Sequence, residues 1–229
     1  MYRNIELRGV HMGKGRIIVL EGLDGCGKST QLELAAEYLL GRGTDCRRIS
    51  FPEYGSDSGR IISEYLNGNI PCEGEIGAYA AASFYAIDRY ISFVKDWKRD
   101  YERGAVILSG RYTSSNIIYQ MTKAVDREGF LNWLTDYEYN KLGLPKPDMV
   151  IFLDMPPEVS QKLLSKRYEG DESQKDIHES DRAFLEDCRS SALYAAELLG
   201  WKKISCAEAG EPRDIRQIHE EIIRIIDNG

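Results

Sequence analysis

The residues best suited to chemistry form a glycine-rich loop near the start of the chain. Residues 22–29 read Gly-Leu-Asp-Gly-Cys-Gly-Lys-Ser and directly follow the apolar run of residues 16–21. Glycines permit backbone conformations that other residues avoid, so successive N–H groups can surround a polyphosphate where the next helix begins. The complete G-x-x-x-x-G-K-[ST] pattern assigns Lys28 to the β- and γ-phosphates and Ser29 to a Mg²⁺ ion. The alternative is a glycine turn with a chance Lys-Ser pair, but the flanking strand and helix patterns favour a nucleotide site. The residues expected to hold the donor nucleotide are Gly22, Gly25, Cys26, Gly27, Lys28, Ser29 and Thr30.

Short apolar runs alternate with helical patterns along the rest of the chain, and these elements must position the loop. Strands are expected at residues 16–21, 45–51, 104–110, 148–154 and 201–205. Helices are expected at residues 30–40, 59–66, 75–102 and 126–142, from residue 156, and at 213–227. This alternation predicts a three-layer α/β/α fold of the P-loop NTPase type, with a five-stranded parallel sheet covered on both faces. Ligands of such folds bind at the carboxyl ends of the strands, so the residues just after each strand are the site candidates.

Composition and charge limit the class of partner. The 229 residues carry a net charge of -7 and include 42% hydrophobic residues, which is enough for one substantial core. We expect a tail at residues 1–12 and a single domain at residues 13–229. The acidic balance argues against nucleic acid or anionic lipid as a partner. No apolar stretch approaches the roughly 20 residues needed to cross a bilayer, and the start lacks the apolar core of a signal peptide, so a cytoplasmic location is expected.

The five cysteines are odd in number and include no C-x-x-C pair, which indicates reduced thiols rather than a disulfide framework or a zinc site. Cys26 lies in the loop, where helix-start amides could lower its pKa. The sequence favours a second interpretation, in which Cys26 is a small loop residue that takes no part in chemistry.

Several blocks and their spacing together resemble the thymidylate kinase family. They lie at residues 21–31, 51–53, 84–89, 111–115 and 143–148, and the resemblance extends from residue 16 to residue 226. It implies phosphorylation of dTMP to dTDP with ATP and Mg²⁺ by in-line phosphoryl transfer. The other functions considered are a kinase for another pyrimidine nucleotide or deoxynucleoside, and a homologue that binds nucleotide without turning it over.

Arg111, at the end of the third expected strand, is placed to hold the acceptor phosphate, because a guanidinium fork suits a dianionic phosphate. Its alternative role is a surface ion pair. Tyr85 and Arg89 lie four residues apart and share a helix face. The resemblance implies that Tyr85 stacks on the pyrimidine and that Arg89 donates to its O4, whereas helical spacing alone would make Tyr85 and its neighbour Phe84 core residues.

The resemblance implies four further substrate contacts. Phe51 would be a wall of the base pocket rather than core filler alone, and Asp24 would contact the substrates or the metal shell rather than only form a turn. Ser115 and Tyr119 complete the implied substrate site.

A polar, basic segment at residues 162–178 fits the lid of the family, which excludes water and brings a cation to the transferred group. Family members with glycine at the position of Gly25 supply this cation from the lid. Arg167 is therefore the expected lid cation, followed by Lys166 and Lys175, and a solvated charge run is the alternative. The expected catalytic residues are Lys28, Arg111, Arg167 and Asp24.

The chain departs from the family pattern at two positions. Gly110 stands where the family commonly has an aspartate, so either Asp154, Asp24 or Glu21 replaces that carboxylate or the enzyme is slow. Tyr54 stands where some members have an arginine. The resemblance also implies a homodimer, for which Ala78, Ala81 and Ala82 offer a close-packed helix face; burial inside one chain would explain these alanines equally well.

Overall fold

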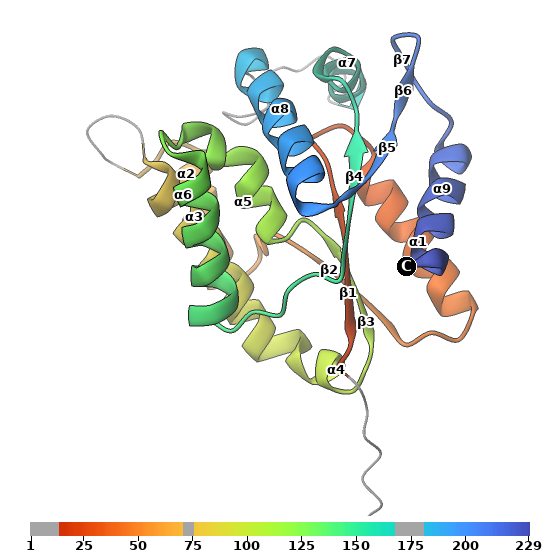
Figure 1. Cartoon of the computed structure of the whole chain (residues 1–229), viewed down its shortest axis with the longest axis horizontal. Helices are drawn as coiled ribbons and strands as arrows, with labels where there is room; N and C mark the ends of the chain where they lie inside the picture. Colours follow the sequence, from red (N-terminus) through yellow and green to blue (C-terminus); the bar gives the residue numbers. More distant parts are fainter. Residues whose placement is uncertain (1–13, 71–75, 168–180) are drawn as a thin grey trace, which may run out of the picture.

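The computed structural model describes residues 14–70, 76–167 and 181–229. Five parallel strands form one sheet in the order β2-β3-β1-β4-β5 (Figure 1). These strands are β1 (Arg16–Glu21), β2 (Cys46–Ser50), β3 (Val106–Gly110), β4 (Met149–Asp154) and β5 (Lys202–Ser205). The predicted five-stranded parallel sheet is confirmed.

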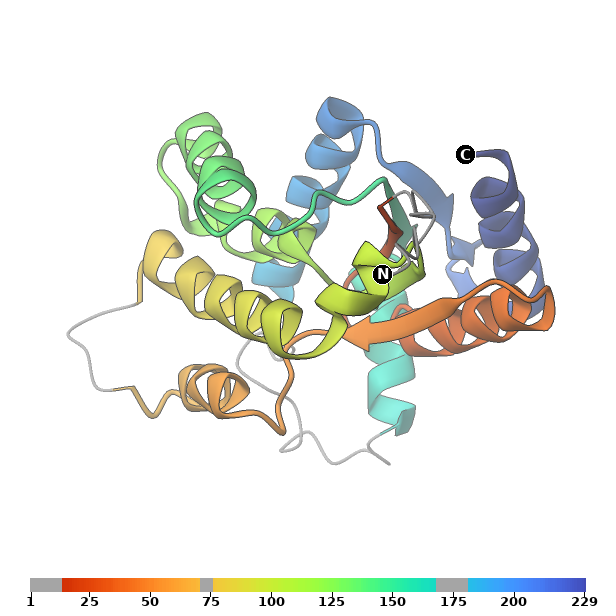
Figure 2. The ribbon, with the colours of Figure 1, turned by 90° about the horizontal axis from the view of Figure 1, so that it is seen from below.

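Helices cover both faces of this sheet. One face carries α1 (Lys28–Gly41) and α9 (Ile215–Asn228), which pack against each other. The opposite face carries most of the other helices (Figures 1 and 2). They are α3 (Ala78–Ser92), α4 (Lys98–Glu102), α5 (Thr113–Tyr119), α6 (Arg127–Thr135) and α8 (Arg182–Leu199). The predicted three-layer α/β/α arrangement is confirmed.

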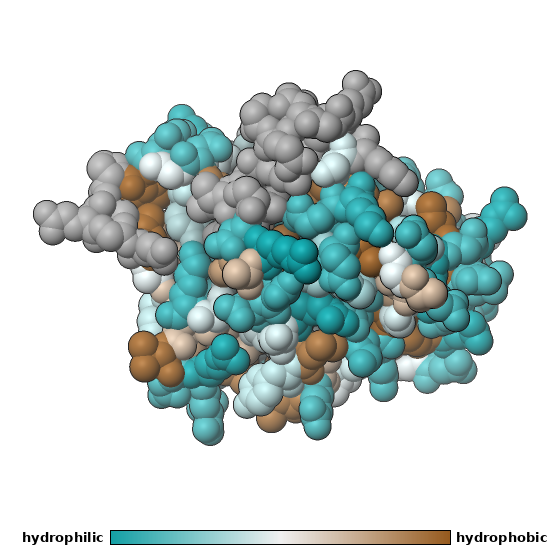
Figure 3. All heavy atoms as spheres, turned by 90° about the horizontal axis from the view of Figure 1, so that it is seen from above, coloured by the Kyte–Doolittle hydropathy of each residue, from teal (hydrophilic) through white to brown (hydrophobic). Residues whose placement is uncertain are grey.

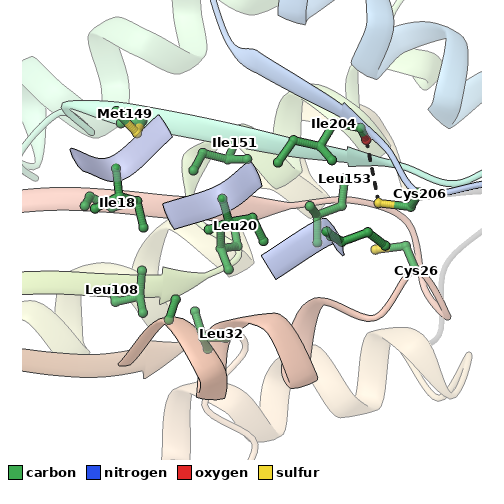
Figure 4. Packing of buried hydrophobic residues seen from close by; sticks show 14 of the residues in the cluster. Ile18, Leu20, Cys26, Leu32, Leu108, Met149, Ile151, Leu153, Ile204 and Cys206 are labelled. Atoms are coloured by element: carbon green, nitrogen blue, oxygen red, sulfur yellow. Dashed lines mark hydrogen bonds between the residues drawn. The ribbon is translucent and has the colours of Figure 1, made fainter. Parts of the chain in front are cut away.

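Alternation along β1 explains why both faces are covered. Ile18 and Leu20 point into the cluster shared with α1 and α9, whereas Ile17 and Val19 belong to the cluster on the other face. Figure 4 shows the first cluster, in which Ile18 and Leu20 lie between side chains of β3 and β4. Strand residues therefore lose contact with water on both sides, as parallel sheets require.

The remaining elements differ from the predicted boundaries in places. The expected helix at residues 75–102 is α3 and α4 joined by a π-helical turn, η1 (Phe93–Trp97). The expected helix at residues 126–142 is α6 followed by a second π-helical segment, η3 (Asp136–Lys141). The other elements are α2 (Asp57–Leu66), the 3-10 turn η2 (Met121–Lys123), α7 (Pro157–Arg167) and the hairpin of β6 (Ala207–Glu208) and β7 (Glu211–Pro212).

Burial inside the chain accounts for the alanines of α3. Ala78 is 4% exposed, and Ala81 and Ala82 are fully buried. The expected tail and most of the expected lid lie outside the described residues. No helix within the described ranges is long and apolar enough to cross a membrane.

The candidate site residues lie at one edge of the sheet, where the strands have their carboxyl ends. The phosphate loop follows β1, Phe51 follows β2, Arg111 follows β3, and Asp154 ends β4. Figure 3 views the molecule from this side, where most of the coloured surface is hydrophilic. The topology therefore directs polar side chains from several strands toward one region.

Candidate active site

The glycine-rich loop connects β1 to α1. Gly27 precedes the helix with a φ of 89°, a left-handed conformation that glycine adopts without a steric penalty. The first helical hydrogen bond joins the N–H of Gln31 to the carbonyl of Gly27 at 3.1 Å. The amides before Gln31 have no acceptor within the helix, and Ser29 and Thr30 are exposed beside them. This arrangement suits an anion.

Lys28 folds back over the loop. Its ammonium donates to the carbonyl oxygens of Gly22 at 2.7 Å and Leu23 at 2.8 Å, and it lies 3.9 Å from a carboxylate oxygen of Asp24. Only 11% of its side chain is exposed. The positive charge is thus already held at the mouth of the phosphate loop.

Asp24 joins the loop to the end of β3. Its carboxylate accepts a charged hydrogen bond from Arg111 and a second bond from the hydroxyl of Tyr119 at 3.2 Å. The Arg111 guanidinium also lies over the Tyr119 ring, 5.2 Å from its centroid, within cation–π range. Burial alone would raise the pKa of Asp24, but Arg111 and Lys28 outweigh burial and lower this pKa to about 2. Asp24 is therefore ionised at neutral pH, between two cations.

A single pocket contains every substrate contact expected from the sequence. Its cavity volume is about 320 Å³, and its lining includes Asp24, Phe51, Tyr85, Arg89, Arg111, Ser115 and Tyr119. The sequence did not anticipate four further residues of the lining: Ser50, Leu66, Asn116 and Gln120. The lining combines charged side chains, among them Asp24 and Arg111 at the phosphate loop, with aromatic and amide side chains.

Tyr85 and Phe84 differ in their surroundings. Both are half-buried, and both contact the ring of Tyr65, with centroids 6.4 Å and 6.0 Å away. Of the two, only Tyr85 lines the pocket, so Phe84 is its packing neighbour. Phe51 combines the two roles considered for it, because it is 4% exposed, packs against Tyr112 and still forms a wall of the pocket.

Arg89 is held by a residue that sequence reasoning missed. Glu138, fully buried in η3, accepts from Nε of Arg89 at 2.7 Å and from Nη2 at 2.5 Å. The same carboxylate accepts from Thr113 at 2.7 Å and from Asn116 at 3.1 Å. Burial would lower the pKa of Arg89, but the Glu138 charge outweighs it and raises this pKa, so the guanidinium stays charged. Glu138 therefore orients two pocket residues, Arg89 and Asn116.

The three carboxylates named as replacements for the missing aspartate at position 110 all have hydrogen-bond or ion-pair partners. Asp24 is paired with Arg111, and Asp154 forms a two-point ion pair with Arg189, at 2.7 and 3.1 Å. Glu21 is fully buried and accepts from three donors at the start of α5. Within the described ranges, no three His, Cys, Asp or Glu side chains are grouped closely enough to hold a metal.

The phosphate loop also packs against α7, the helix that leads toward the expected lid. Gly25 has a φ of 77°, and a Cβ atom there would lie 2.8 Å from the carbonyl oxygen of Ser160. This contact and the positive φ disfavour any larger residue at position 25. Arg167 is the last residue of α7, and Lys175 lies outside the described residues. Burial raises the pKa of the Cys26 thiol, which agrees with the passive role favoured from the sequence.

A phosphate loop that opens onto an arginine-lined pocket at the carboxyl edge of a parallel sheet defines a P-loop phosphotransferase. The family model for thymidylate kinase matches residues 20–222. The chain therefore belongs to the thymidylate kinase family and is a nucleoside monophosphate kinase, with dTMP phosphorylation as its general activity.

Relatives support this assignment along the whole chain. A probable thymidylate kinase of Thermococcus kodakarensis is 33% identical over 213 residues, covering 92% of this chain and 96% of the relative. The thymidylate kinase of Danio rerio is 27% identical, with 93% of each chain covered. The solved structure of thymidylate kinase from Candida albicans has the same fold, with a TM-score of 0.67 and 21% identity, covering 94% of this chain and 92% of that one.

Proposed function

We propose that the enzyme transfers the γ-phosphoryl group of ATP to dTMP, in line and with Mg²⁺, and that the pocket described above holds dTMP. The carrying observation is that Arg111 lines the pocket and is also ion-paired to Asp24 of the phosphate loop. A monophosphate bound there would lie next to the donor phosphates, as in-line transfer requires.

The acceptor nucleotide would be held at its two ends. Arg111 offers a fork to the monophosphate, and Asp24 and Tyr119 orient that fork. At the base end, Tyr85 would stack on the pyrimidine and Arg89 would donate to O4. Because Glu138 accepts from Nε–H and from one N–H of Nη2, the N–H groups of Nη1 and the second N–H of Nη2 are the donors that Glu138 leaves for this bond. Phe51 and Ser115 complete the walls.

The donor nucleotide would be held by the phosphate loop. Three groups would donate to its phosphates: the backbone amides at the start of α1, the side chain of Lys28, and Thr30. Ser29 is exposed in the first helical turn, where its hydroxyl fits a Mg²⁺ ligand. When bound, Mg²⁺ would neutralise charge on the transferred phosphoryl group. Arg167 would supply a further cation from the lid at residues 162–178.

The proposal includes the assembly and location of the enzyme. Ile87, Tyr90 and Val94 form an exposed stripe at helical spacing on α3 and η1, with 38%, 36% and 45% exposure, and this stripe supports a homodimer. The net charge of -7 supports small-molecule rather than nucleic-acid partners. A cytoplasmic location fits the expected use of ATP and dTMP.

The test is an ADP-release assay with ATP and Mg²⁺ in which the acceptor is dTMP, dUMP, thymidine or absent. We expect turnover with dTMP to exceed that with thymidine strongly, because thymidine gives Arg111 no anion to bind. Preference over dUMP rests on one methyl group and is expected to be about 10- to 200-fold at most. Lys28→Ala is the inactive control, and Ser191→Ala, a change at a residue that does not line the pocket, is the active one. ATP binding without acceptor-dependent turnover would instead identify a nucleotide-binding homologue that lost catalysis with the aspartate absent at position 110.

A further inference from the structure

Arg111 has an unusual backbone conformation for a residue with a side chain. Its φ is 74°, in the left-handed region. A side chain in this region is disfavoured, because Cβ comes close to the carbonyl oxygen. Such a conformation persists only when neighbouring groups hold it, and it is common at ligand sites. The groups that hold Arg111 are therefore of functional interest.

Two buried side chains hold the peptide bond that follows Arg111, one at each end. The hydroxyl of Ser109 donates to the carbonyl oxygen of Arg111 at 2.7 Å. On the other end, the N–H of Tyr112 donates to Oε1 of Glu21 at 3.1 Å. Ser109 and Glu21 are both fully buried. Because these bonds fix both polar atoms of one peptide bond, they fix the direction in which the chain leaves Arg111.

Glu21 also connects this peptide to the rest of the pocket. The same Oε1 atom accepts from the hydroxyls of Ser114 at 2.7 Å and Ser115 at 2.8 Å, and Ser115 lines the pocket. Its second oxygen, Oε2, is buried and has no hydrogen-bond partner in the part of the chain described. Glu21 therefore acts through one oxygen, as an acceptor for the start of α5.

We propose that Glu21 and Ser109 are positioning residues that hold Arg111 in its left-handed conformation and so aim its guanidinium at the acceptor phosphate. The inference rests on the role of Arg111 in the proposed function. This positioning role differs from the earlier expectation that Glu21 substitutes for the absent aspartate near the metal. A metal ligand would need the negative charge of Glu21, whereas positioning needs a side-chain oxygen that accepts hydrogen bonds.

The first test is Ser109→Ala, measured by steady-state kinetics with dTMP and ATP varied separately. Loss of one hydrogen bond to the Arg111 carbonyl is expected to raise KM for dTMP about fivefold, with KM for ATP changed less than about twofold. Ser191→Ala is the matched control, because Ser191 is also fully buried and donates to a backbone carbonyl, that of Ile117, at 2.8 Å. The two variants are expected to lower Tm equally, but only Ser109→Ala should change KM for dTMP.

The second test compares Glu21→Gln with Glu21→Leu. Glutamine keeps an acceptor oxygen of the same reach, so Glu21→Gln is expected to retain KM for dTMP within about threefold, while Glu21→Leu raises it at least about tenfold. Equal loss of kcat in both variants would show that the charge is needed and would overturn the positioning role. Equal KM for dTMP in Ser109→Ala and Ser191→Ala would overturn it as well.

Arg111→Lys separates this inference from the proposed function. If Arg111→Lys leaves KM for dTMP unchanged, the role of Arg111 itself is wrong. If Arg111→Lys raises KM while Ser109→Ala and Glu21→Leu do not, the role of Arg111 stands and the positioning inference alone is wrong.

Discussion

The buried pair of Arg89 and Glu138 allows the sharpest prediction about stability and binding together. The side chains of Arg89 and Glu138 are 1% and 0% exposed, and two hydrogen bonds join them. Removing one partner of a buried ion pair costs about 3–5 kcal/mol, because the remaining charge has no compensation. Thr113 and Asn116 would also lose an acceptor, at about 1 kcal/mol each. Glu138→Ala is therefore expected to lower the free energy of unfolding by about 5–7 kcal/mol.

A loss of that size approaches the whole stability of many domains, about 5–15 kcal/mol, so the measurable variant is Glu138→Gln. Glutamine keeps one acceptor oxygen, but its NH₂ group would face the N–H and O–H donors that now bind the second carboxylate oxygen. We therefore expect the free energy of unfolding to fall by about 3 kcal/mol. KM for dTMP should rise as well, because Arg89 and Asn116 both line the pocket.

Urea unfolding followed by tryptophan fluorescence measures the stability, and a double-mutant cycle with Arg89→Met isolates the pair. The double variant should be more stable than the sum of the two single losses predicts, by at least about 2 kcal/mol, since it leaves no unpaired charge. A loss below about 1 kcal/mol for Glu138→Gln, or additive losses in the cycle, would refute the reasoning.

Four further predictions concern the phosphate loop and α7. Since the folded-state pKa of Asp24 is about 2 and its ordinary value 3.8, the ionised group stabilises the fold above about pH 4 and loses this effect as pH falls toward 2. Asp24→Asn should lack this contribution of about 2 kcal/mol at neutral pH. The difference in the free energy of unfolding between wild type and variant, measured by urea unfolding, should therefore shrink on acidification, and a difference independent of pH would contradict this. Because burial raises the Cys26 pKa, iodoacetamide should label Cys26 in the folded protein at pH 7.5 far more slowly than in urea, as mass spectrometry of the loop peptide would show. Gly25→Arg should lower stability by about 1–3 kcal/mol, owing to the positive φ and the contact with Ser160, and an unchanged urea midpoint would argue against that contact. Arg167→Ala should lower kcat at least about a hundredfold, and near-normal turnover would reject its assignment as the lid cation.

The architecture was predictable because its signals are local. Apolar runs marked the three inner strands, β3, β1 and β4, whereas the edge strands β2 and β5 carry basic residues; all five observed strands lie within the predicted ranges. Position alone predicted Arg111, which follows a strand end, whereas Tyr85, Phe51, Ser115 and Tyr119 were expected in the site only because of the family resemblance. All seven expected substrate contacts line one pocket. Their individual roles in binding and catalysis stay predictions.

The parts that the sequence did not reveal depend on contacts between distant residues. Glu138 lies 49 residues from Arg89, and nothing in the local pattern of residues 136–141 marks it as the partner of a pocket residue. The only available signal was an acidic residue on a helical segment that was otherwise expected to pack. Likewise, the positive φ of Arg111 arises from two side chains on different strands, so no local propensity predicts it.

The close packing of Gly25 against α7 has a mechanical consequence. The loop and the helix meet with no room for even one extra carbon atom, at 2.8 Å from the Ser160 carbonyl oxygen. A rigid helix pressed against a loop at such a point cannot shift toward it without displacing the loop backbone. The contact of Ser160 and Leu164 with Gly25 therefore couples the position of α7 to the backbone conformation of the phosphate loop.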